Sequence, residues 1–133
     1  MDCVFCKIIK GDISSEKIFE DENSFAFLDI KPNSPGHTLL VPKKHARNIF
    51  DIPHDTLCAL MHPLQKVSHA VKEGVGAGGL NIIMNNEAPS GQIVFHAHFH
   101  IIPRHEGDNT KHRLTMEEKE RREIAEKIKK FLM

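Results

Sequence analysis

The chain has 133 residues, enough for one compact domain that buries a core without disulfides or an obligatory metal. Lysine plus arginine equals aspartate plus glutamate, at 18 each, so the charge balance suggests neither a nucleic-acid nor a membrane-surface partner. The sequence shows no export signal and no apolar run of the roughly 20 residues that span a membrane, so we expect a cytoplasmic protein with reduced or metal-binding cysteines.

The N-terminal third of the chain is predicted to form a helical turn followed by strands. Residues 3–10 favour the helical turn, which a glycine closes. The alternating apolar residues of 17–20 and 24–29 predict a hairpin, since a polar turn separates the two runs. After a loop with two prolines, residues 37–41 have the composition of a buried strand.

Two helices are predicted in the rest of the chain. Apolar residues at three- and four-residue spacing over 55–73 predict the main helix. We expect Asp55 as its N-cap, a kink at Pro63 and Cys58 in its buried face. A second, highly charged helix carries only one apolar stripe, so residues 105–133 are expected to form a charged C-terminal extension appended to the core.

Two further strands complete the predicted fold. Residues 80–84 are an apolar strand, 85–92 a polar loop and 93–102 the last strand. Together these elements predict a single domain over residues 1–133. Its class is α+β, with an antiparallel sheet of about five strands packed with one main helix, plus the C-terminal helix.

Histidines alternate strictly with apolar residues in the last of these strands. Because alternate residues of a strand share a face, His96, His98 and His100 are predicted to line one side. On the other side, Phe95, Ala97, Phe99 and Ile101 are expected to enter the core. The outer two histidines are then roughly 13 Å apart, too far to share one small metal ion, so their roles differ.

Three interpretations of this pattern compete. Solvation on an exposed face is the usual explanation of a lone histidine, but it explains three in alternation poorly. Two histidines two positions apart can also bind a catalytic zinc. However, the loop just upstream offers amide side chains and backbone N–H groups that suit an anion, from Asn85, Ser90, Gly91 and Gln92. Phosphate chemistry is therefore favoured.

The histidine run and the segments before it resemble the histidine triad (HIT) family of nucleotide hydrolases and transferases. The resemblance covers about residues 3–104 and is specific because several motifs occur in a fixed order. It rests on Pro35-Gly36-His37, Pro42-Lys43-Lys44-His45, Asn85, Gly91, Gln92 and the run from His96 to Ile102. The resemblance implies the fold of that family and an enzyme acting at the α-phosphorus of a nucleotide.

The resemblance also implies a role for each polar residue of the motifs. His98 maps to the nucleophile that attacks phosphorus and briefly carries the nucleotidyl group. His100, Asn85 and Gln92 map to groups around the transferring phosphate, where donors stabilise developing charge. His37 maps to a fourth histidine, which supports the triad without contacting the substrate itself.

The implied substrate is a purine nucleotide conjugate, and the implied activity is that of a nucleoside phosphoramidase or nucleotidyl hydrolase. Asp29 maps to the carboxylate that holds the ribose hydroxyls. The base would lie between apolar walls formed by Val4, Phe5, Ile8, Phe27, Ile30 and Leu39. The implied partner is a second copy of the chain, in a homodimer.

Cys3 and Cys6 have the Cys-x-x-Cys spacing that suits two thiolate ligands, with redox chemistry as the competing interpretation. Zinc-containing members of the family complete such a site with two histidines, which map to His45 and His96. The resemblance thus implies zinc as a structural cofactor. The remaining histidines are expected on the surface: His54, His62, His69, His105 and His112.

Two features depart from the phosphoramidase branch of the family. Ile93 stands where that branch commonly has serine, and the chain has no tryptophan. Hydrolysis of dinucleoside polyphosphates is therefore the runner-up activity, because it uses the same chemistry with a different leaving group. The alternatives of another class are a zinc-dependent hydrolase, with His96 and His98 as metal ligands, and a nucleotide-binding protein with little turnover.

Overall fold

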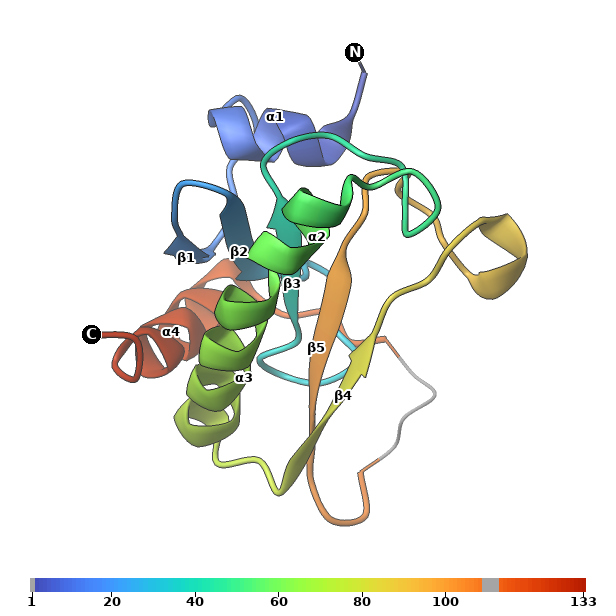
Figure 1. Ribbon diagram of the computed structural model, residues 1–133. Coiled ribbons are helices and arrows are strands. Elements are labelled where there is room, and N and C mark those ends of the chain that lie inside the picture. The colour runs from blue at the N-terminus through green and yellow to red at the C-terminus, as the bar shows by residue number, and fades with distance from the viewer. Residues whose placement is uncertain (1, 109–112) are drawn as a thin grey trace.

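The fold is centred on one antiparallel sheet, as seen in a computed structural model that describes residues 2–108 and 113–133 (Figure 1). The strands are β1 (Lys17–Glu20), β2 (Ser24–Leu28), β3 (Thr38–Pro42), β4 (Gly79–Ile83) and β5 (Phe99–Arg104). The helices are α1 (Val4–Lys10), α2 (His54–Ala59), α3 (Met61–Val75) and α4 (Glu118–Lys129), with a 3-10 turn η1 (Ala88–Ser90). The five strands lie in the order β1-β2-β3-β5-β4, each antiparallel to its neighbours. The predicted α+β class is confirmed.

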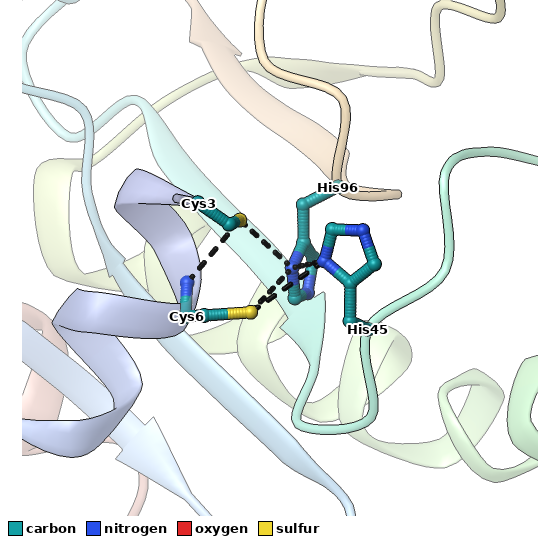
Figure 2. Close-up of side chains that lie close together, drawn as sticks. All are labelled: Cys3, Cys6, His45 and His96. Carbon is teal, nitrogen blue, oxygen red and sulfur yellow. Dashed lines mark hydrogen bonds between the residues drawn. The ribbon is translucent and has the colours of Figure 1, made fainter. Parts of the chain in front are cut away.

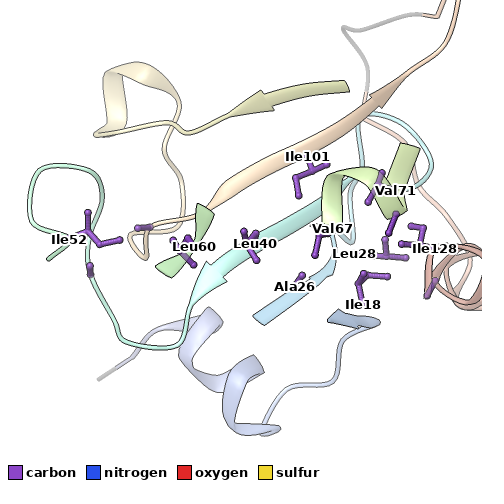
Figure 3. Packing of buried hydrophobic residues seen from close by; sticks show 14 residues of the cluster. Ile18, Ala26, Leu28, Leu40, Ile52, Leu60, Val67, Val71, Ile101 and Ile128 are labelled. Atoms are coloured by element: carbon purple, nitrogen blue, oxygen red, sulfur yellow. The ribbon is translucent and has the colours of Figure 1, made fainter. Parts of the chain in front are cut away.

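The main core lies between the sheet and α3 (Figure 3). Leu40 of β3 and Ile101 of β5 are fully buried in one cluster with Val67 and Val71, which α3 contributes from successive turns. Burial of such a side chain stabilises the fold by about 1.5–3 kcal/mol. This core fixes β3 and β5 side by side, and both strands carry residues of the histidine motifs.

A second apolar cluster lies on the opposite face of the sheet, beneath α1. Its residues from β3 are Leu39 and Val41, which alternate with Leu40 and therefore point away from α3. Phe5 of α1 packs edge-on against Phe27 of β2, with ring centroids 5.4 Å apart. Helix α1 thus covers the face toward which the histidines of the motif also point.

The predicted main helix is divided at Leu60 into α2 and α3. The expected kink at Pro63 is wrong, because Pro63 lies in the first turn of α3, where its missing N–H breaks no intrahelical bond. Asp55 lies in the first turn of α2, and Pro53 rather than Asp55 occupies the N-cap. Cys58 is exposed, not part of the helix core as expected.

The C-terminal helix packs into the core and is not merely appended to it. Ala125 and Ile128 of α4 are fully buried and belong to the main cluster. A Cβ atom at Gly74 of α3 would lie 2.7 Å from the Cα atom of Ile128, so glycine permits this close approach. No helix in the described ranges has the length and apolar character needed to cross a bilayer.

The last strand is shorter than predicted. Strand β5 begins at Phe99, and residues 93–98 before it are irregular, with a bend at residues 94–96. They lack ladder partners because β4 ends at Ile83, which pairs with His100. Phe95 is 37% exposed and does not enter the core, whereas Ala97 and Ile101 do so as predicted.

The histidines outside the motifs lie on the surface where the structure describes them. Those that are exposed are His54, His62, His69 and His105. His112 lies outside the described residues. The strict burial of the motif histidines His37, His96 and His98 therefore sets them apart from the rest.

Candidate functional site

A cavity of about 780 Å³ lies between α1, the end of β2 and the loop before β5. It is lined by every residue predicted to contact the base or the ribose: Val4, Phe5, Ile8, Phe27, Asp29, Ile30 and Leu39. His98, His100 and Asn85 line it as well. The structure therefore brings three of the five predicted catalytic residues into one pocket with the predicted walls.

The ring orientation of His98 is set by the backbone of His96, two positions earlier. Nδ1 lies 2.7 Å from the carbonyl oxygen of His96. A carbonyl oxygen can only accept, so Nδ1 carries the proton and Nε2 keeps the free lone pair. The Phe5 ring meets the His98 ring edge-on, with centroids 5.1 Å apart. Burial lowers the pKa of His98, which favours the neutral ring with one unprotonated nitrogen.

His37 and His100 form a directed hydrogen-bond chain. The backbone N–H of Asn33 donates to His37 Nδ1 at 3.0 Å, so the proton of His37 lies on Nε2. His37 Nε2 is 3.0 Å from His100 Nδ1 and donates to it, which leaves His100 with its proton on Nε2. Burial lowers the pKa of both histidines to about 4, so both are neutral at pH 7. His37 itself does not line the cavity.

Asp29 follows β2 at the edge of the cavity. Its side chain is 12% exposed and accepts hydrogen bonds from the Lys31 backbone and from Arg113, at 2.9 and 3.2 Å. Arg121 of α4 also lines the cavity. Neither arginine was expected at the site from the sequence, because both belong to the C-terminal extension; Arg113 reaches Asp29 across 84 residues of chain.

The polar loop upstream of the histidines has two different parts. Asn85 and Gly91 line the cavity, and Gly91 has a φ of 105°, which favours glycine. Gln92 does not line it. The Gln92 amide nitrogen donates to the carbonyl oxygens of Arg47 and Val94, and its oxygen accepts from Asn48 and the Glu87 backbone. The geometry therefore gives Gln92 a scaffolding position instead of the expected phosphate contact.

Cys3, Cys6, His45 and His96 converge on one point (Figure 2). The Sγ-to-Nδ1 distances are 3.4 Å for Cys3–His96 and 3.5 Å for Cys6–His45 and Cys6–His96, and the two Nδ1 atoms are 3.1 Å apart. A tetrahedral zinc ion gives about 3.6 Å between sulfur and nitrogen ligands and about 3.3 Å between two nitrogen ligands. The four side chains thus fit a closed zinc site.

The orientation of His96 supports the same conclusion. His96 Nε2 lies 2.8 Å from the carbonyl oxygen of Pro42, so it carries the proton and Nδ1 presents a lone pair to the cysteines. A metal-binding histidine generally donates its other N–H in this way. His96 is fully buried, and Cys3 is 8% exposed, so the cluster is closed to solvent on most sides.

A second cluster, of Asp29, His37 and His100, also places three possible metal ligands close together, but its hydrogen bonds leave His37 without a free lone pair. The Asn33 N–H points at His37 Nδ1, so His37 Nε2 must hold a proton and has no lone pair for a metal. The first cluster is therefore suited to zinc and the second to hydrogen bonding. His98 belongs to neither, which disfavours a catalytic metal shared by His96 and His98.

Comparison with known proteins places these features in one family. The HIT domain model matches residues 10–107. The chain is 45% identical over 104 residues to the adenosine 5'-monophosphoramidase of Schizosaccharomyces pombe, which covers 78% of this chain and 75% of that protein. It is 40% identical over 107 residues to an adenylylsulfatase of Arabidopsis thaliana, covering 80% of this chain and 54% of that protein.

A solved structure matches the whole fold. A Zn-bound histidine triad family protein from Mycobacterium smegmatis superposes with a TM-score of 0.90 at 38% identity. The match covers 99% of this chain and 94% of the other. The likeness therefore includes α4 and the C-terminal segment that contributes Arg113 and Arg121 to the cavity.

Proposed function

Since the chain belongs to the histidine triad family, we propose that it hydrolyses purine nucleoside 5'-phosphoramidates or related nucleotidyl conjugates at the α-phosphorus. The observation that carries the proposal is the fixed tautomer of His98, whose unprotonated Nε2 belongs to a residue lining the cavity. The relatives named as a monophosphoramidase and an adenylylsulfatase support a nucleotide hydrolase.

The proposed substrate would contact two parts of the cavity, one apolar and one polar. The purine would pack between the apolar side chains of α1 and β2, including Phe5 and Phe27. Asp29 would accept hydrogen bonds from the ribose hydroxyls, in the place where it now meets Arg113. The α-phosphate would then lie beside His98, His100 and Asn85, which line the same cavity.

The proposed reaction has two steps. His98 Nε2 attacks phosphorus, and the bond to the leaving group breaks; a sulfate leaves with the electron pair, and an amine takes a proton from water. In the nucleotidyl-imidazolium that forms, Nδ1 keeps its proton and donates it in a hydrogen bond to the His96 carbonyl oxygen. Water then attacks phosphorus, the phosphorus–nitrogen bond breaks, and a proton returns to solvent, which regenerates neutral His98.

His100 and Asn85 would stabilise the charge that develops on phosphate oxygens. The directed chain from Asn33 through His37 gives His100 an Nε2–H, which can only donate. Such oriented donors typically contribute about 2.7–4 kcal/mol each to transition-state stabilisation. Gln92 would act indirectly, by holding the loop that carries Asn85.

Zinc in the Cys3, Cys6, His45 and His96 cluster would be structural. It would tie α1, which forms part of the apolar wall, to the segment after β3 through His45 and to the segment before β5 through His96. Reduced thiolates are required for this role and suit the cytoplasm, where we place the protein.

A turnover screen tests the proposed activity. We expect hydrolysis of adenosine 5'-phosphoramidate and adenylyl sulfate to AMP in assay buffer with EDTA and no added magnesium, because no step uses an exchangeable metal. Preferred cleavage of diadenosine polyphosphates would support the runner-up activity. Activity that EDTA abolishes in a still-folded protein would indicate the zinc-dependent hydrolase, and tight AMP binding without turnover a nucleotide-binding protein.

We also propose a homodimer. Strand β4 lies at one edge of the sheet, and its Ile82 and Ile83 are 47% and 41% exposed. An exposed apolar edge strand favours pairing with another chain. Light scattering at micromolar concentration should give twice the chain mass of 15.1 kDa. A monomeric mass at all accessible concentrations would contradict the prediction, and Ile82→Lys should shift the mass toward monomer.

A further inference from the structure

A hydrogen-bonded clamp, formed by Arg47, Asn48 and Glu87, joins the segment after His45 to the loop that carries Asn85, and its own three residues do not line the cavity. Arg47 donates to both carboxylate oxygens of Glu87, at 2.7–3.2 Å. Asn48 Nδ2 donates to Glu87 at 2.6 Å and to Gln92 Oε1 at 3.1 Å. Asn48 is 1% exposed, so the centre of the clamp is shielded from water although the Arg47–Glu87 pair reaches the surface.

Glu87 has a backbone conformation that side chains rarely adopt. Its φ of 76° and ψ of 155° lie in a region populated almost entirely by glycine, and it is the one non-glycine residue with positive φ in the described ranges. Its backbone N–H donates to Gln92 Oε1 at 2.7 Å. The surrounding contacts must therefore hold Glu87 against its own conformational preference.

The clamp connects both functional parts of the molecule. Glu87 lies two residues after Asn85, and it is the N-cap of the turn η1, whose C-cap is Gly91. Asn85 and Gly91 both line the cavity. On the other side, Arg47 follows the zinc-cluster residue His45 by two residues. The residue between His45 and Arg47 is also held: the Ala46 carbonyl accepts a hydrogen bond at 2.8 Å from the N–H of Ala97, which lies between His96 and His98.

We propose that Arg47 and Asn48 are positioning residues that hold Glu87 in its strained conformation and so keep Asn85 directed at the α-phosphate. The inference rests on the proposed function for the role of Asn85, but not for the clamp itself. The Arg47 hydrogen bonds, and then the one from Asn48, lower the pKa of Glu87 to about 2, so the carboxylate stays charged at any assay pH above that.

Comparison of Glu87→Ala with Glu87→Gly separates positioning from a mere surface ion pair. Both variants remove the carboxylate, but only alanine keeps the steric conflict at positive φ. For Glu87→Ala we expect kcat about tenfold lower with KM within about twofold, since the base and ribose contacts are untouched. For Glu87→Gly we expect kcat within about threefold of the parent protein. Arg47→Ala, which keeps Glu87, should resemble Glu87→Ala.

Equal losses in the alanine and glycine variants would overturn the proposal, because the carboxylate itself would then matter. Unchanged kcat in Glu87→Ala and Arg47→Ala would overturn it equally. The matched control is Glu126→Ala, which removes an exposed ion pair with Lys129 on α4 and should alter neither constant.

Amide hydrogen exchange makes the inference independent of the substrate. Protection of the Glu87 N–H should fall at least about tenfold in Glu87→Ala and Arg47→Ala, and much less in Glu87→Gly. If the parent protein hydrolysed none of the adenylyl conjugates but the variants showed this pattern of exchange, the proposed function would be wrong and the clamp would be supported. If the exchange rates of all variants matched the parent, the clamp would fail whatever the activity.

Discussion

Replacing His98 with alanine is expected to lower kcat on an adenylyl conjugate by at least about a thousandfold while AMP still binds. The loss is large because the unprotonated Nε2 of His98 is the proposed attacking atom, and no other histidine of the cavity has a free nitrogen directed by a carbonyl. AMP affinity should change by less than about threefold, since Asp29 and the apolar walls remain. Calorimetry with AMP and steady-state kinetics measure the two effects separately.

A matched variant and a trapping experiment complete this test. His69→Ala removes an exposed histidine of α3 and should leave turnover unchanged. Quenching the parent protein in alkali during turnover of α-phosphate-labelled substrate should leave label on His98. If His98→Ala instead lost bound metal and no covalent species formed in the parent, His98 would be a metal ligand and the mechanism proposed here would be wrong.

Removal of the zinc cluster should have the second-largest effect. We expect about one zinc per chain by elemental analysis, and loss of that zinc in Cys6→Ser. A ligand present at about a thousandfold its dissociation constant stabilises the folded state by about 4 kcal/mol, so the melting temperature should fall by roughly 10–20 °C. AMP binding should weaken as well, because α1 carries Val4, Phe5 and Ile8 of the pocket wall.

The third cysteine supplies the control for the zinc experiment. Cys58 is exposed on α2 and belongs to no metal cluster of the described residues, so Cys58→Ser should keep both zinc content and melting temperature. A stably folded parent protein that contains no zinc and does not respond to added zinc would remove the structural-zinc proposal. It would leave the prediction for His98 untouched.

The sequence predicted the strands of the sheet well because strand formation depends on local pattern. Alternation of apolar residues predicted the strands at 17–20, 24–29 and 37–41 close to their observed bounds. It also predicted that Ala97 and Ile101 face the core. The family resemblance added the residues of the pocket wall and the zinc cluster, which local pattern alone could not distinguish from ordinary core.

Other predictions failed where non-local packing decides. The extent of the last strand depends on its partners, and β4 ends too early to pair with residues 93–98. The charge of the C-terminal helix suggested an appendage, but Gly74 lets Ile128 approach α3 closely enough to enter the core. Strand pairing and helix docking both join segments far apart in the chain, so no local window contains them.

By itself, the sequence determined which side chains are available for the chemistry: three alternating histidines, a Cys-x-x-Cys pair and a polar loop before them. Only the tertiary structure decided which nitrogen of each histidine carries the proton. The carbonyl group of Pro42 makes the assignment for His96 from 54 positions away, whereas the His96 carbonyl and the Asn33 N–H act on rings two and four positions along the chain, through the backbone path of the folded segments. Because a hydrogen bond fixes a tautomer only when donor and acceptor meet, the differences between the histidines on which their proposed roles rest arise with folding.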